Sequence, residues 1–295
     1  ASGKTAWVID TARTGAQGLQ RTPIIVVATP LQARSINRRL ALSGGALGVR
    51  VLTFDQLYAD ILQQAGDVYT ELAEPVRFRL LRGVINAEAA TGNLPFYSPL
   101  ASSIGFAVVV QDLIGLFKGA AIAPEQFLAA IPITPEYTRL RELGGIYLRY
   151  QQLLQAQAWS DRQGMAWLAL EALQRPTTHW QVNRSPILFD GFDSFTQVQL
   201  SAISALAAAT ETVVVTLTGD VAAANGDAPA RPALLHYAET AATLRQALGV
   251  RAEPMPALRS NAAPMLSQLT DRIFSPPPAP IPVDANPPDA VTLVE

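Results

Sequence analysis

The stretch PIIVVATPLQARSINRRL, residues 23–40, decides the fold that we expect for this chain of 295 residues. Its first part is a continuous apolar, β-branched run between Pro23 and Pro30, which is typical of a strand buried on both faces. The part that follows has the pattern of a helix. A doubly buried strand that passes directly into a helix indicates a parallel sheet covered by helices.

The same alternation of strand and helix occurs on both sides of this stretch. GVRVLTF (residues 48–54) predicts a second strand, and DQLYADILQQAG (residues 55–66) predicts a helix that Asp55 caps. Further on, SPILFDGF (residues 185–192) and ETVVVTLTGD (residues 211–220) predict two more strands, with a helix between them. The fold class is therefore α/β, with a parallel sheet and helices on both of its faces.

A long helical segment separates the two groups of strands. Residues 67–183 carry apolar side chains at three-and-four spacing almost throughout, which predicts a large all-helical insertion. The sheet domain would then comprise residues 1–66 plus 184–275. Residues 276–295 are expected to form a Pro-rich linker and the start of a following domain. We expect a piece of a longer protein, since the chain lacks an initiator Met and its last residues resemble a strand cut short.

Composition excludes several classes of site. The chain has no cysteine and two histidines, so these residues hold no disulfide, no Cys-ligated zinc and no Fe–S cluster. A net charge of −2 provides no overall basic field for nucleic acid, although a local basic groove remains compatible with it. No apolar run reaches membrane-spanning length, and no signal peptide is visible. We therefore predict a soluble, cytoplasmic protein with no membrane partner.

The first residues contain a phosphate-binding pattern. Ser2-Gly3-Lys4-Thr5 matches the end of G-x-x-x-x-G-K-[ST], although the first glycine of that loop would lie upstream of residue 1. Gly3 would let the backbone approach phosphate, Lys4 would meet the β and γ charges, and the Thr5 hydroxyl would ligate Mg²⁺. The alternative is a polar N-terminus that binds nothing.

Asp190 supplies the second part of this predicted site. It ends the apolar strand ILFD, where a carboxylate that positions Mg²⁺ would lie at the carboxyl edge of the sheet. By itself, such an Asp more often caps the next turn. Because Gly3, Lys4 and Thr5 precede it in an α/β pattern, we interpret these four residues as an ATP site, with Thr5 and Asp190 holding Mg²⁺.

The order of these segments resembles superfamily 1 DNA helicases of the UvrD type. TPLQARSINRRL (residues 29–40), TFDQLYADIL (residues 53–62) and LFDGFDSFTQVQ (residues 188–199) stand at three successive motif places of those helicases. A closer resemblance is to the N-terminal helicase-like region of AddB/RexB, and it is strongest in ILFDGFDSFTQVQLSAISAL (residues 187–206). This resemblance extends over essentially the whole chain. AddB/RexB is a component of the bacterial AddAB-type helicase–nucleases, which process double-strand breaks.

That resemblance implies a RecA-like P-loop fold that binds ATP and Mg²⁺. It also implies two kinds of partner, namely single- or double-stranded DNA ends and an AddA-like helicase–nuclease subunit. The nuclease domain of the family and its Fe–S cluster lie at the far C-terminus, so neither is expected in these residues. Among DNA-binding candidates, Thr29, Thr53 and Phe54 stand directly after predicted strands, at motif places of the helicases. Arg34 and Arg38 lie four residues apart on one helix face, although solvated arginines of an amphipathic helix would show the same spacing.

One departure from the helicase pattern concerns catalysis. Gly191 stands where active helicases carry the Glu that positions or activates the attacking water, and Asp193 holds the place of the family's Gln. Gln199 is retained. The resemblance therefore implies an inactivated helicase-like subunit that binds DNA and a partner, and that holds ATP without efficient hydrolysis. Two alternatives stay open: an active motor whose base is supplied elsewhere, for example by Asp193, and a P-loop kinase for a small molecule.

Overall fold

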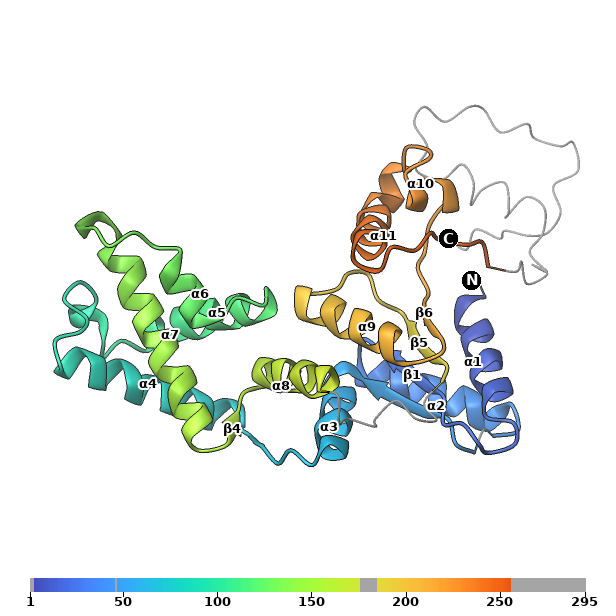
Figure 1. The fold of residues 1–295 in the computed structure, drawn as a ribbon, viewed down its shortest axis with the longest axis horizontal. Coiled ribbons are helices and arrows are strands. Elements are labelled where there is room, and N and C mark those ends of the chain that lie inside the picture. The colour runs from blue at the N-terminus through green and yellow to red at the C-terminus, as the bar shows by residue number, and fades with distance from the viewer. Residues whose placement is uncertain (1–2, 46, 176–184, 256–295) are drawn as a thin grey trace, which may run out of the picture.

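The computed structural model describes residues 3–45, 47–175 and 185–255. The predicted linker, residues 276–295, and the last part of the predicted sheet domain lie outside the described residues. Figure 1 shows a parallel sheet with helices packed on it, and a second, helical lobe beside it. The order of elements along the chain places this lobe between the second and third strands of the sheet.

The sheet has four strands in the order β2-β1-β5-β6, and every neighbouring pair is parallel. The strands are β1 (Ile24–Val27), β2 (Arg50–Thr53), β5 (Ile187–Asp190) and β6 (Val213–Val215). In the register of the sheet, Val27 lies opposite both Thr53 and Asp190, so the carboxyl ends of three strands form one edge. The predicted α/β class with a parallel sheet is confirmed.

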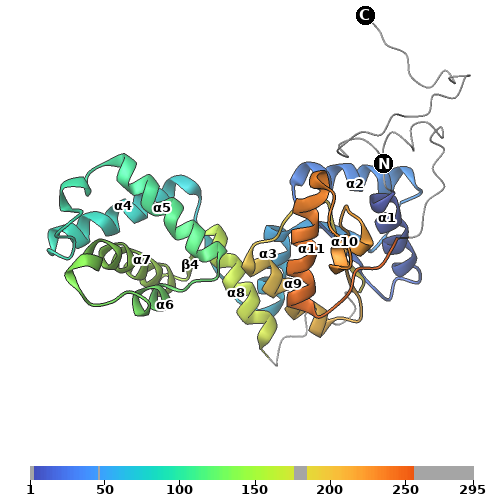
Figure 2. The ribbon, with the colours of Figure 1, turned by 90° about the horizontal axis from the view of Figure 1, so that it is seen from above.

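Helices cover both faces of this sheet, as predicted (Figure 2). Ile25, Val27 and Leu188 point to one face, and Ile24 and Val26 point to the other. The first face packs against α1 (Lys4–Gly15) and α2 (Pro30–Leu42). The second packs against α3 (Phe54–Ala65), α8 (Arg162–Gln174), α9 (Gln197–Ala209) and α11 (Leu235–Leu248). The short α10 (Val221–Asn225) and the 3₁₀ turn η3 (Pro232–Leu234) join β6 to α11. The continuous apolar strands are explained by this burial on two faces.

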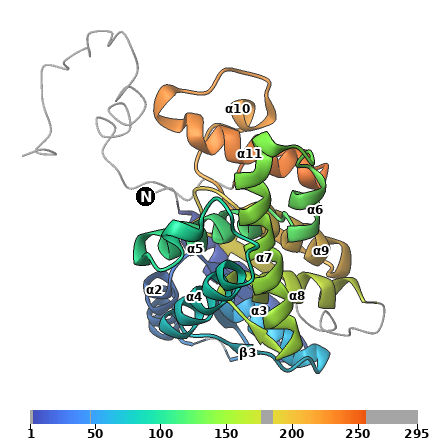
Figure 3. The ribbon, with the colours of Figure 1, turned by 90° about the vertical axis from the view of Figure 1, so that its left-hand side faces the viewer.

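The helical lobe, which faces the viewer in Figure 3, has its own core of buried side chains. Its helices are α4 (Glu74–Ala90), α5 (Ile104–Gly119), α6 (Pro124–Ala129) and α7 (Thr138–Ala156), with 3₁₀ turns η1 (Ser98–Leu100) and η2 (Pro135–Tyr137). Leu81, Ile85, Val110 and Tyr147 lie at the centre of this core, each at most 1% exposed. Among the described residues, no helix has both the length and the apolar composition needed to cross a membrane.

Two details of the lobe differ from the prediction. Residues 67–183 are not all helical, because β3 (Thr70–Glu71) and β4 (Trp159–Ser160) pair in parallel where the chain enters and leaves the lobe. Strands of two residues leave no alternation that a sequence could show. In addition, α8 contributes the buried residues Ala166, Ala169 and Ala172 to the core that covers the sheet, where it packs on α3 and α9. The division at residues 67 and 183 stays a prediction.

Candidate nucleotide site at the carboxyl edge of the sheet

The first helix begins at the carboxyl edge of the sheet. Gly3 is its N-cap and has φ 76°, in the left-handed region that glycine adopts at no steric cost. Within the described part of the chain, no side chain caps this end, so no capping residue there bonds the first N–H groups of the helix. The N-terminal end of a helix carries partial positive charge, so these N–H groups favour an anion. The packing of α1 on β1 and β5 holds them beside the sheet.

Two predicted ligands of Mg²⁺ lie side by side next to this helix end. The Thr5 hydroxyl donates a hydrogen bond of 2.7 Å to one carboxylate oxygen of Asp190. Asp190 is only 4% exposed, and the hydroxyl of Thr216 donates to its other carboxylate oxygen. The carboxylate is therefore fixed by a hydroxyl on each side, one from α1 and one from the residue that follows β6.

The structure also brings Lys4 to this place. Its ammonium group donates a hydrogen bond to the hydroxyl of Thr218. Burial lowers the pKa of Lys4 from its ordinary value, and the negative charges of Asp190 and Asp193 partly oppose that shift. Sequence reasoning missed Thr216 and Thr218. Their alternation in the stretch T-L-T, which places both side chains on one side of an extended chain, is the signal that could have found them.

Gly191 follows Asp190 in a conformation that disfavours a side chain. Its φ is 79°, and a Cβ atom built there would lie 2.9 Å from the side-chain nitrogen of Gln32. That nitrogen donates a hydrogen bond of 3.4 Å to the Gly191 carbonyl. Asp193 is held differently: its carboxylate lies close to Tyr237 and raises the pKa of that phenol, and the Thr240 hydroxyl donates to its backbone carbonyl at 2.7 Å. Neither residue reproduces the glutamate of an active helicase.

Comparison with known proteins identifies the family of this chain. The model of a family described as "ADDB, N-terminal" matches residues 1–257. The chain belongs to this family. The resemblance inferred from the sequence is thereby confirmed.

Several AddB proteins are similar to this chain, and each is named as a subunit of an ATP-dependent helicase/deoxyribonuclease. The protein of Staphylococcus carnosus is 26% identical over 211 residues, which cover 70% of this chain and 18% of the relative. That of Listeria innocua is 23% identical over 228 residues, covering 75% and 19%. That of Moorella thermoacetica is 28% identical over 208 residues, covering 67% and 18%. The chain thus spans less than a fifth of the length of these AddB relatives.

In this member of the AddB N-terminal family, three helices that follow strands begin with the same capping box, T-x-x-Q. The pairs are Thr29 with Gln32, Thr53 with Gln56, and Thr196 with Gln199. In each box the Thr hydroxyl accepts from the Gln backbone N–H, and the Gln side chain accepts from the Thr backbone N–H. Thr29, Thr53 and Gln199 therefore have a structural role that fixes the helix starts at the carboxyl edge.

The remaining DNA-binding candidates differ in exposure. Phe54 is 5% exposed and packs against the rings of Phe189 and Phe192, so a contact with DNA would require it to leave this core. Arg34 and Arg38 are exposed on α2, and neither forms an ion pair with another described residue. The structure thus leaves the two arginines, and not Phe54, available at the surface.

Proposed function

We propose that this chain is the N-terminal, helicase-like part of an AddB-type helicase–nuclease component, with a RecA-like P-loop domain that binds ATP–Mg²⁺ without efficient hydrolysis. One observation carries the proposal. The hydrogen bond of 2.7 Å between Thr5 and Asp190 joins the end of the phosphate-loop pattern to the edge of the sheet, with Lys4 beside both.

The residues at this edge fit the nucleotide and its metal ion. The N–H groups at the start of α1 and the Lys4 ammonium group suit the phosphates, which are negatively charged. The Thr5 hydroxyl and the Asp190 carboxylate provide the oxygen ligands that Mg²⁺ prefers. When bound, the ion would neutralise charge on the phosphates. Asp190 is already held by Thr5 and Thr216, so it need not be ordered when the ligand binds.

Residues at the same edge also favour the second part of the proposal, that the bound ATP is hydrolysed inefficiently. An active motor needs a group that orients or deprotonates the attacking water, in a place close to the γ-phosphate. Here the residue after Asp190 is Gly191, whose φ of 79° strains any residue with a side chain. Asp193, the alternative base, has its carboxylate beside Tyr237 and its backbone carbonyl bonded to the Thr240 hydroxyl of α11. Both observations support a nucleotide-binding domain that does not work as a motor.

DNA and a second subunit are the partners that we propose. Arg34 and Arg38 supply two exposed cations on α2 that form no ion pair with another described residue, and α2 starts at the same sheet edge. Phosphate contacts of this kind position nucleic acid and need few cations. The related proteins are named as subunits of a helicase and deoxyribonuclease, which supports a role alongside a partner subunit. We also propose a cytoplasmic location for the chain.

The test is equilibrium binding of a fluorescent ATP analogue with Mg²⁺ to the full-length protein. We expect binding that Lys4→Ala abolishes and that the matched control Thr14→Ala, at the exposed far end of the same helix, leaves unchanged. ATP hydrolysis is measured in the same samples, with and without single-stranded DNA. Binding that survives Lys4→Ala would contradict the site. Turnover comparable to that of active helicases would contradict the proposed inactivity and favour the motor alternative.

A further inference from the structure

Lys4 and Asp190 carry opposite charges at the same carboxyl edge of the sheet, yet these two described residues form no ion pair. Two carboxylates act on the Lys4 ammonium group through their charge, and Asp190 has a larger effect than Asp193. Lys4 bonds instead to the hydroxyl of Thr218. Burial removes part of the water around the ammonium group, which makes a nearby carboxylate a favourable partner. The separation of Lys4 from Asp190 therefore has a specific cause in the surrounding residues.

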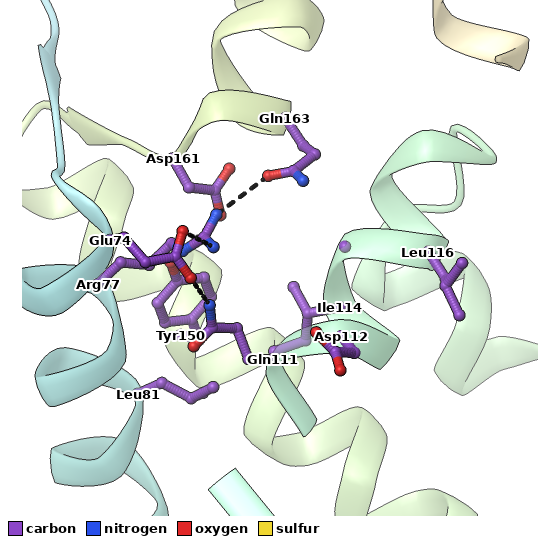
Figure 4. Close-up of a pocket in the computed structure, with 11 residues that line it drawn as sticks. Glu74, Arg77, Leu81, Gln111, Asp112, Ile114, Leu116, Tyr150, Asp161 and Gln163 are labelled. Carbon is purple, nitrogen blue, oxygen red and sulfur yellow. Dashed lines mark hydrogen bonds and ion pairs between the residues drawn. The ribbon is translucent and has the colours of Figure 1, made fainter. Parts of the chain in front are cut away.

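A pocket in the helical lobe shows what opposite charges do when nothing separates them (Figure 4). In its wall the Arg77 guanidinium pairs with the Glu74 carboxylate at 2.8 Å. Gln111 donates to the other oxygen of Glu74 at 2.6 Å. The two charges neutralise each other. A phosphate site that closed in this way would lose the positive charge that attracts the nucleotide.

At the carboxyl edge, two hydroxyl groups from one segment after β6 bind the two charges separately. The backbone N–H of Thr216 donates to the Phe189 carbonyl at 2.9 Å, which continues the pairing of β5 with β6. This register places the Thr216 hydroxyl against the Asp190 carboxylate. Thr218 lies two positions further along, on the same side of an extended chain, so its hydroxyl reaches the ammonium group of Lys4.

These hydroxyl partners are neutral, which distinguishes this edge from the pocket of the lobe. Thr5 donates to one oxygen of the Asp190 carboxylate at 2.7 Å, and Thr216 donates to the other oxygen. The Lys4 ammonium group is a multiple donor, so its bond to Thr218 leaves protons free for phosphate oxygens. Each charged group thus has part of its hydrogen bonding satisfied while its charge stays uncancelled.

We propose that Thr218 is a positioning residue of the nucleotide site, which keeps the Lys4 ammonium group free for phosphate and away from the Asp190 carboxylate. Without the Thr218 hydroxyl, the ammonium group turns to Asp190, and the ion pair that forms closes the site to nucleotide. The inference rests on the proposed binding of ATP. It adds a requirement that the phosphate-loop pattern does not contain, namely a neutral hydrogen-bond acceptor for the lysine.

The direct test is a crystal structure of the full-length Thr218→Val variant without nucleotide. We expect the Lys4 ammonium group to lie within about 4 Å of the Asp190 carboxylate, at the distance of an ion pair. Thr218→Ser keeps the hydroxyl, so it should keep the two groups apart, as in the unaltered protein. An ammonium group that stays away from Asp190 in Thr218→Val would overturn the inference. This readout does not require nucleotide to bind, so it is separate from the test of the proposed function.

Binding of the fluorescent ATP analogue in EDTA gives a second readout, because no metal ion then shields Asp190. Thr218→Val should weaken this binding about tenfold, since it removes a hydrogen bond to a charged group. Adding Asp190→Asn removes the competing carboxylate. It should therefore raise the affinity of Thr218→Val by a larger factor than it raises the affinity of the unaltered protein. Equal factors in the two backgrounds would overturn the inference, because Thr218 would then act independently of Asp190.

Asp193→Asn is the matched control for the loss of a negative charge near Lys4. Asp193 also acts on the ammonium group, less strongly than Asp190 does. Asp193→Asn should change the affinity by the same factor with and without Thr218→Val. A larger factor in the Thr218→Val background would make Asp193 the competing carboxylate and overturn the pairing with Asp190. If the unaltered protein binds no nucleotide even with Mg²⁺, that result contradicts the proposed function instead.

Discussion

Thr5 and Asp190 are 185 positions apart in the sequence, and the hydroxyl of the first donates a hydrogen bond of 2.7 Å to the carboxylate of the second. The contact is formed because α1 packs on β5 in the sheet and starts at its carboxyl edge. Thr216 holds the other oxygen of the same carboxylate. The geometry thus assigns a positioning role to a residue that has no place in the phosphate-loop pattern.

Replacing Thr216 by Val should weaken the contribution of Mg²⁺ to nucleotide binding. The variant removes one hydrogen bond from Asp190, worth about 1 kcal/mol, so we expect Mg²⁺-dependent affinity to fall roughly fivefold. Titration of Mg²⁺ at fixed nucleotide measures this, and binding in EDTA should not change. Thr216→Ser keeps the hydroxyl and serves as the control. An equal loss with and without Mg²⁺ would show that Thr216 acts on the fold and not on the metal ligand.

Nucleotide affinity should depend on pH through Lys4. Burial lowers the pKa of this ammonium group below its ordinary value of 10.5, so the positive charge is lost earlier as pH rises. Affinity should therefore be complete below the lowered pKa and should decline as the pH passes through it. Anisotropy titrations across alkaline pH would measure the decline. In Lys4→Arg, whose guanidinium stays charged, the decline should disappear, and its persistence would assign the titration to another group.

Restoring the glutamate of active helicases should not restore a motor. Gly191→Glu forces a side chain onto a backbone with φ 79° and against Gln32, at a cost of about 1–3 kcal/mol. We expect no gain in DNA-stimulated ATP hydrolysis and a lower urea midpoint. Gly83→Ala is the control, because Gly83 lies inside α4 with no neighbour within 4 Å of an added Cβ, and it should be neutral or stabilising. Substantial turnover by Gly191→Glu would contradict this prediction.

Replacing one partner alone in the buried ion pair of Lys118 and Asp161 should lower the free energy of unfolding. Both side chains are at most 3% exposed, and Tyr150 and the Gly164 N–H also bond to the Asp161 carboxylate. Lys118→Met leaves that carboxylate uncompensated, so the free energy of unfolding should fall by about 3–5 kcal/mol. Adding Asp161→Asn removes the second charge and keeps an acceptor for Gly164, so the double variant should recover part of the loss. Urea denaturation decides between these outcomes: a double variant less stable than Lys118→Met would contradict the charge argument.

Parts of this fold could be predicted because their physical cause is local. The β-branched run at residues 24–27 is apolar at every position, which requires burial on both faces, and the structure confirms it. The strand pair β3 and β4 could not be predicted, since each has two residues and forms only where the chain ends of the lobe meet. Phe54 illustrates a third case: an aromatic residue after a strand fits a surface or a core equally well in sequence, and only packing against Phe189 decides for the core.

The sequence by itself determined the parallel α/β class, because hydrophobic periodicity is a property of neighbouring positions. Loop patterns of the same local kind predicted the site residues Gly3, Lys4, Thr5 and Asp190. The tertiary structure alone decided that Thr216 and Thr218 bond to Asp190 and Lys4 at the carboxyl edge, and that the Gln32 side chain lies against Gly191. Each of these depends on atoms from distant segments. Strand register and helix packing bring such atoms within hydrogen-bonding or van der Waals distance, and no local pattern encodes those distances.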